Sequence, residues 1–121
     1  MSYPLRLGHA ASAWVVRVQP VDGATGVFRD TPVLARLSRP ADGRSLSAAT
    51  FGVDDTTGRV PARLRLSPDG LTVFWFGERR LDPGVEHHVS VSGLLDQEGR
   101  EFLPHASRFV ACGLAREDLP G

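Results

Sequence analysis

Apolar and polar residues alternate in short runs along this chain of 121 residues, and residues that favour turns separate the runs. The runs are Trp14 to Gln19, Val33 to Ser38, Thr50 to Val53, Val60 to Ser67, Leu71 to Phe76, His87 to Val91 and Ser107 to Cys112. A period of two places successive side chains on opposite faces of a strand. The sequences DGATG, DDTTG, SPDG and LDPG between the runs favour tight turns. The pattern therefore predicts about seven strands in an all-β antiparallel sandwich.

One face of each strand is expected to close over a shared interior. The residues predicted to contribute to this core include Val16, Leu37, Val73, Val89 and Phe109. Pro61 lacks an amide hydrogen, so the strand that contains it should lie at a sheet edge or a bulge. Turn signals flank residues 58–66 on both sides, and this segment fits either sheet.

The length of the chain fits one domain with a single core. We expect an N-terminal arm over residues 1–11, the sandwich over residues 12–113 and a C-terminal tail over residues 114–121. Ser45 to Ala49 is too short for an independent helix, and it predicts one helical turn with Ser45 as its cap.

Charge and composition narrow the range of partners. Fourteen basic and fourteen acidic residues cancel, so we expect no net field that draws the chain to nucleic acid or to an anionic membrane. No apolar run approaches the roughly 20 residues that span a bilayer, which predicts no membrane insertion. Cys112 is the single cysteine and has no internal disulfide partner. Every basic residue is Arg, and Lys, Asn and Ile are absent, which indicates a GC-rich bacterial genome.

Six motifs in series cover Val16 to Cys112: VQPVDGATGV, DTPVLARLSRP, SLSAATFGVDDTTGRVPARL, SPDGLTVFW, LDPGVEHHVSVSGLLDQEG and SRFVA. In this order they resemble bacterial immunoglobulin-like domains of the S-layer-protein (SbsA-like) type. The resemblance implies an immunoglobulin-like sandwich that is used in repeats on surface or secreted proteins, without catalysis. It also implies a tyrosine at the start of a late strand. His87 or His88 stands near that place, so we expect the imidazole to make a structural hydrogen bond.

The resemblance implies a cell-surface or secreted location, but the localisation stays open. Met1 to Val18 lacks the basic start and continuous apolar core of a secretion signal. An N-terminus of this kind fits a cytoplasmic protein, a protein exported by another route, or a protein whose signal was removed.

Histidines are the first candidate metal ligands. The candidates for a zinc site are His9, His87, His88, His105 and Cys112. They lack the C-x-x-C or H-x-x-x-H spacing that zinc sites favour. The GHA sequence at Gly8 to Ala10 is similar to the start of periplasmic copper-binding sandwiches. Met1 is the one methionine, however, and the matching late histidine motif is absent.

Turn carboxylates are the second set of candidate ligands. Asp54, Asp55, Asp96 and Glu98 have the oxygen chemistry that calcium prefers, although Asp in a turn more often supports the backbone. We expect no metal and no cofactor. The sequence contains no G-x-S-x-G elbow, phosphate loop or recognisable acid and base pair, so we predict no enzymatic activity and assign no catalytic residues.

An apolar stripe with arginines at its border is the candidate binding surface. In immunoglobulin-like sandwiches the first, second and fifth strands share a sheet, and alternation then places one set of side chains on its outer face. This set is Val15, Arg17, Leu34, Arg36, Thr72, Phe74 and Phe76. Aromatic and Arg residues are enriched at protein interfaces. The alternative is that Met1 to Ala11 folds back and covers the stripe with Tyr3, Leu5 and Leu7.

We therefore predict a noncatalytic interaction or spacer module of a bacterial surface, secreted or multi-protein assembly. Its partner would be a protein or a neighbouring domain, bound through strand faces or edges. The first alternative is a carbohydrate-binding module in which Trp14, Trp75 or Phe76 stacks on sugar rings. The second is a metal-binding sandwich that resembles the copper carriers. The sequence leaves the partner's identity and the oligomeric state open.

Overall fold

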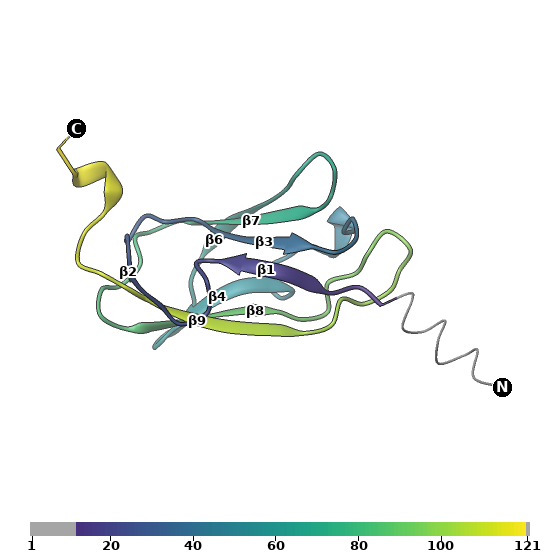
Figure 1. Cartoon of the computed structure of the whole chain (residues 1–121), viewed down its shortest axis with the longest axis horizontal. Coiled ribbons are helices and arrows are strands. Elements are labelled where there is room, and N and C mark those ends of the chain that lie inside the picture. The colour runs from purple at the N-terminus through teal and green to yellow at the C-terminus, as the bar shows by residue number, and fades with distance from the viewer. Residues whose placement is uncertain (1–11, 121) are drawn as a thin grey trace.

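The computed structural model describes residues 12–120 and consists of two β-sheets packed face to face (Figure 1). The strands are β1 (Val15–Gln19), β2 (Ala24–Val27), β3 (Val33–Leu37), β4 (Phe51–Asp55), β5 (Gly58–Arg59), β6 (Ala62–Leu66), β7 (Thr72–Gly77), β8 (Glu86–Val91) and β9 (His105–Ala111). Two short 3₁₀ turns complete the list, η1 (Gly43–Ser45) and η2 (Arg116–Asp118). The predicted all-β sandwich is confirmed. The described residues form nine strands because β2 and β5 are short elements that alternation alone did not indicate.

The first sheet has the strand order β1-β3-β7-β6, and the second has the order β2-β9-β8-β4-β5. All neighbours pair antiparallel except β2, which runs parallel to β9. The DGATG segment, which we interpreted as a turn alone, begins as a turn and continues as the first three residues of β2. Its positive φ angles at Gly23 (83°) and Gly26 (67°) let the chain bend from the first sheet to the second.

A β-bulge in β1 overturns two predictions about its side chains. Val15 pairs with Leu37 and Arg17 pairs with Arg36, so one additional residue lies between these two pairs. The bulge breaks the alternation at Val16, which is 53% exposed instead of buried in the core. Val15 was expected on the outer face, but it packs against the core. The other four predicted core residues are buried as expected.

Residues 58–66 divide between the two sheets. β5 pairs with β4 in the five-stranded sheet, whereas β6 pairs with β7 in the four-stranded sheet. Pro61 lies between the two strands, where the chain crosses from one sheet to the other. The prediction that Pro61 marks a sheet edge is confirmed, because β5 and β6 each end their own sheet.

The core is formed by the inward side chains of both sheets. Its largest members include Trp75 of β7, Phe51 of β4 and Phe109 of β9, each at most 1% exposed. The SPDG turn that precedes β7 is present as predicted, and the Gly70 amide donates to the Ser67 carbonyl at 2.9 Å. Gly70 has a φ of 76°, and a Cβ atom there would lie 2.9 Å from the Cβ of Pro40.

The helical turn predicted over Ser45 to Ala49 lies earlier in the chain, at Gly43–Ser45, and has a different cap. η1 begins after Asp42, whose side chain accepts a hydrogen bond from the Arg44 amide at 3.0 Å. Asp42 is therefore the N-cap, and Ser45 is the last residue of the turn. The Ser45 hydroxyl donates to the Asp42 carbonyl at 2.7 Å and accepts from the Leu95 amide at 3.0 Å.

Residues 114–120 lie against the sandwich. The Arg29 amide donates to the Leu114 carbonyl at 2.9 Å, and Ala115 is buried. Asp30 accepts hydrogen bonds from the Arg116 amide at 2.7 Å and from the Glu117 amide at 3.0 Å, at the start of η2. Within residues 12–120, no helix has the length and apolar character needed to cross a membrane.

Candidate functional site

The outer face of the four-stranded sheet carries most of the residues predicted for binding. We call it the Arg–Phe face, and it consists of Arg17, Leu34, Arg36, Arg63, Arg65, Thr72, Phe74 and Phe76. The strand register places Leu34 beside Phe74 and Arg36 beside Thr72. On the other side of β7, Arg65 lies beside Phe74, and Arg63 lies beside Phe76. The face is therefore apolar in the middle and basic at both borders.

Two phenylalanines form the apolar middle of this face. The Phe74 and Phe76 rings stack with centroids 6.0 Å apart and an interplanar angle of 13°. Both side chains are half-buried, and a hollow of about 300 Å³ opens beside them. The residues around this hollow are Arg65, Leu66, Ser67, Pro68, Phe74 and Phe76. Aromatic rings held in a fixed stack offer contact area with little side-chain entropy left to lose.

The strands of the Arg–Phe face carry positive charge and no carboxylates of their own, although Asp69 in the turn before β7 lies near Arg36. Its four strands contain four arginines and no Asp or Glu. Arg36 donates to the Thr72 hydroxyl at 3.4 Å. The guanidinium groups of Arg17, Arg63 and Arg65 form no hydrogen bond or ion pair with any residue between 12 and 120.

The opposite sheet presents a different surface, because its arginines have acidic neighbours. Arg59 pairs with Asp54 at 2.9 Å, and Arg108 pairs with Glu86 at 3.5 Å. The chain has zero net charge, but its charges are unevenly distributed, and one side of the sandwich is basic. Such a local field acts on partners at short range even where the whole chain is neutral.

Six of the seven predicted site residues lie on the Arg–Phe face, and Val15 is the exception because of the bulge. The prediction missed Arg63 and Arg65. Both already alternate with apolar residues in the sequence, but the uncertain sheet membership of residues 58–66 hid their position. The pairing of β6 with β7 brings them onto this face.

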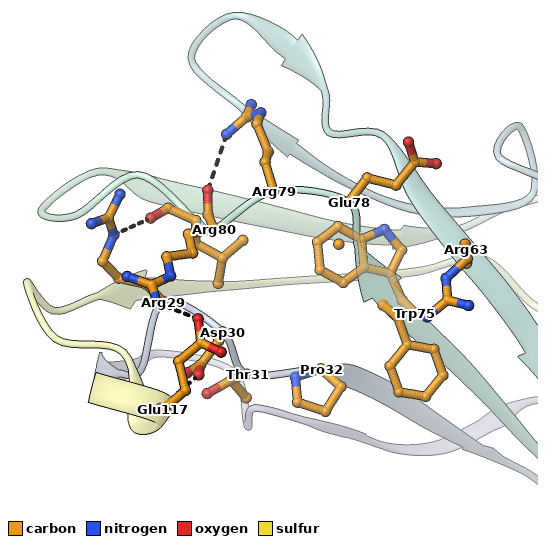
Figure 2. A pocket seen from close by; sticks show the side chains of 13 residues that line it. Arg29, Asp30, Thr31, Pro32, Arg63, Trp75, Glu78, Arg79, Arg80 and Glu117 are labelled. Atoms are coloured by element: carbon orange, nitrogen blue, oxygen red, sulfur yellow. Dashed lines mark hydrogen bonds and ion pairs between the residues drawn. The ribbon is translucent and has the colours of Figure 1, made fainter. Parts of the chain in front are cut away.

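A second arginine-rich hollow lies at the end of the sandwich near η2 and has a volume of about 370 Å³. Figure 2 shows Arg29, Arg80 and Glu117 together at one end of it, with Trp75 and Arg63 at the other. Arg80 pairs with Glu117 and with Asp118, and these carboxylates raise its pKa. The charge in this hollow is therefore largely neutralised. The hydrogen bonds to η2 amides also hold the pKa of Asp30 below its usual range.

An ion pair between a buried carboxylate and a partly exposed arginine joins β4 to the loop after β7. The carboxylate of Asp55, whose side chain has no exposed surface, accepts from Arg79 at 2.7 Å. It also accepts from the Thr57 hydroxyl at 2.7 Å and the Thr57 amide at 2.8 Å. The Arg79 guanidinium and the Thr57 groups lower the pKa of Asp55 well below its usual range. Asp55 thus stays ionised at neutral pH and anchors the β4–β5 turn.

His87 has the structural role expected for the residue at the start of the late strand. Its side chain is buried and stacks on Phe109 with centroids 5.2 Å apart. The Nδ1 atom lies 3.1 Å from the Val85 carbonyl, so it carries the hydrogen that is donated there. Burial lowers the pKa of His87, and the neutral ring therefore fits this site. Nε2 is buried and has no partner among the described residues.

The candidate metal ligands are separated or engaged in other contacts. Asp54 pairs with Arg59, and Asp96 pairs with Arg100 at 3.2 Å. The same Arg100 contacts Glu98. Within residues 12–120, no group of three His, Cys, Asp or Glu side chains is arranged to hold a metal ion. His9, Tyr3, Leu5 and Leu7 lie outside the described residues.

Of the three aromatic residues named for sugar stacking, Trp75 is not available at the surface, whereas Trp14 and Phe76 are accessible. Trp75 is 1% exposed and belongs to the core, which contradicts its assignment to a sugar-stacking surface. Trp14 is 49% exposed, and its amide donates to the Ser38 hydroxyl just beyond the end of β3. Phe76 lies at the opposite end of the sheet, next in register to the start of β3. Trp14 and Phe76 therefore do not form one shared stacking platform.

No protein-family model and no curated protein matches the chain. Among solved structures, domains 1–6 of the bacterial surface-layer protein SbsC superpose with a TM-score of 0.66 at 20% identity. The match covers 90% of this chain and 15% of that chain. An L,D-transpeptidase from Mycobacterium smegmatis matches with a TM-score of 0.59 at 20% identity, over 84% of this chain and 41% of that one.

CopC from Methylosinus trichosporium OB3b has a TM-score of 0.64 at 16% identity, and the match covers 89% of this chain and 99% of that chain. Identities in this range show the fold alone. The chain has an immunoglobulin-like sandwich of the kind present in S-layer proteins. It spans about 15% of the length of the SbsC chain that it matches.

Proposed function

We propose that this chain is a noncatalytic immunoglobulin-like interaction or spacer module of a bacterial surface, secreted or multi-protein assembly. A protein partner or a neighbouring domain binds its Arg–Phe face. One observation carries the proposal. Two stacked and half-buried phenylalanines lie on the same face as three arginines that have no partner among the described residues.

The energetics favour a partner over exposure to solvent. Full burial of a Phe side chain stabilises a complex by roughly 1.5 to 3 kcal/mol, and Phe74 is only half-buried in the isolated chain. Planar guanidinium groups at the rim form bidentate hydrogen bonds with carboxylates and add specificity. An apolar centre with a charged rim is the usual anatomy of a protein interface.

The comparisons support the idea of a module. In SbsC and in the mycobacterial L,D-transpeptidase, the matched sandwich is one part of a longer chain, because the match covers 15% and 41% of those chains. The CopC chain consists almost entirely of this fold, so the sandwich also exists alone. The proposal for this chain therefore depends on its own Arg–Phe face.

A capture experiment with matched variants tests the proposal. The tagged chain, a Phe74→Ser variant and a Val110→Ser variant are expressed in the source bacterium, and the co-purifying proteins are identified by mass spectrometry. Val110 is half-buried like Phe74 but lies on β9 of the other sheet, which makes it the matched control. We expect at least one protein to be lost with Phe74→Ser and retained with Val110→Ser. Identical sets from all three folded chains contradict the proposal.

A further inference from the structure

β6 is the one long and regular edge strand among the four edges of the two described sheets. The edges are β1, β6, β2 and β5. β1 contains the bulge at Val16, β2 changes register between Ala24 and Val27, and β5 has two residues. Bulges and short length are devices that keep sheet edges from pairing with other strands. β6 has five residues, pairs with β7 without a register shift, and contains no Gly or Pro.

The pairing pattern identifies the backbone groups that β6 leaves open. The Glu78 amide donates to the Pro61 carbonyl, and the Ser67 amide donates to the Thr72 carbonyl, both at 2.9 Å. Hydrogen-bonded pairs alternate along an antiparallel ladder, so the odd-numbered residues of β6 bond to β7. The N–H and C=O groups of Ala62, Leu64 and Leu66 therefore point away from the sheet. Within residues 12–120, no hydrogen bond outside the ladder uses these groups.

The side chains of β6 define what fits against this edge. Arg63 and Arg65 are exposed on the Arg–Phe face, and Leu64 on the opposite side is half-buried. If β6 paired antiparallel with β6 of a second copy about Leu64, Arg63 would lie opposite Arg65 on both sides. Like charges directly opposite each other destabilise a strand pair, and opposite charges stabilise it. The edge is therefore unfavourable for self-association and favourable for acidic residues.

We propose that β6 accepts an extended acidic segment of a protein partner as an additional strand of the four-stranded sheet. In this segment, acidic residues alternate with apolar ones. The acidic side chains lie beside Arg63 and Arg65, and the apolar side chains cover Leu64 at the open edge. The backbone bonds to Ala62, Leu64 and Leu66 supply affinity, and the alternation supplies specificity. This inference rests on the proposed function, because it names the chemistry and binding mode of the partner at the border of the Arg–Phe face.

Three synthetic heptapeptides test the proposal on the full chain. In the first, glutamate alternates with valine. In the second, lysine replaces the glutamates, and in the third, proline replaces the valines, which keeps the charge but removes backbone donors. Binding is followed by NMR, together with the hydrogen exchange of individual amides. We expect the glutamate–valine peptide to bind about tenfold more tightly than the lysine peptide and to slow exchange at Ala62, Leu64 and Leu66.

The doubly substituted variant Arg63→Glu/Arg65→Glu keeps the backbone edge and reverses its charge. We expect it to prefer the lysine peptide, with the same three amides protected. Equal binding of the acidic and basic peptides, equal binding of the proline peptide, or no binding at millimolar concentration overturns strand addition. NMR signal changes that are confined to Phe74 and Phe76, without slower exchange of the Ala62, Leu64 and Leu66 amides, also overturn strand addition. In that last case the proposed function stands, because the partner docks on the face, and the capture experiment with Phe74→Ser decides that question separately.

Discussion

The bulge in β1 leads to a prediction that contradicts simple alternation. Val15 packs against the core, whereas Val16 is 53% exposed. A Val→Ala substitution removes about two methylene equivalents, each worth about 0.8 kcal/mol when fully buried. Because Val15 is partly exposed, we expect Val15→Ala to lower the free energy of unfolding by about 1 kcal/mol. Val16→Ala should lower it by less than about 0.5 kcal/mol, a surface effect.

Urea unfolding followed by tryptophan fluorescence measures both losses, since Trp75 is buried in the core. Val33→Ala is the control for a fully buried valine, and we expect it to cost about 2 kcal/mol because a cavity adds to the lost transfer energy. A loss of 1 kcal/mol corresponds to about 4 to 8 °C in the melting temperature of a domain of this size. A larger loss for Val16→Ala than for Val15→Ala would refute the bulge, because strict alternation places Val16 in the core.

Three further substitutions test the interior. Asp55→Asn removes a carboxylate whose pKa in the folded chain lies below the unfolded value of about 3.8, because Arg79 stabilises its charge. The carboxylate therefore stabilises the folded state fully above about pH 3.8, and this contribution is lost as the pH falls below that value. At pH 7 the variant should unfold at a lower urea concentration than the wild type. Between pH 4 and pH 3 its free energy of unfolding should fall by less than that of the wild type. Burial lowers the pKa of His87 from 6.5, so wild-type stability should decline as the pH falls below about 6.5. The urea midpoints at pH 7 and pH 5.5 should differ less in His87→Phe than in the wild type. An equal difference in both proteins would contradict the claim that the buried His87 ring causes this loss of stability. Gly77→Ala should cost about 1 to 3 kcal/mol in urea unfolding, because its Cβ would lie 2.9 Å from the Trp75 ring. Gly113→Ala, with no atom within 4 Å of the new Cβ, should cost little, and equal losses would argue against the clash.

Most of the fold follows from local patterns in the sequence. β3, β7 and β8 have turn residues at both ends, and their buried faces are those expected. In β8 polar and apolar residues alternate, so the period of two indicates the buried face. β7 is apolar on both faces, and its outward side was expected from the strand order of immunoglobulin-like sandwiches. Pro61 also indicated a sheet edge or a bulge before the partner strands were known.

Features that depend on the partner strand were not predictable. Val15 and Val16 are chemically identical, so composition cannot tell which of them the bulge turns outward. The role of Asp55 depends on Arg79, which lies 24 positions away. Arg63 and Arg65 were visible as polar positions, but their membership of the binding surface depends on the sheet that β6 joins. Such long-range pairings are set by the whole fold and leave no local signal.

Site-specific photo-cross-linking shows whether the Arg–Phe face contacts a protein partner in the cell. A benzophenone-bearing phenylalanine analogue replaces Phe74 in one version of the chain and Val110 in another, and both are irradiated in the source bacterium. We expect a covalent adduct with a defined protein from position 74 on the Arg–Phe face and none from position 110. Adducts from position 110 alone, or none from either position in the folded chain, would contradict this expectation.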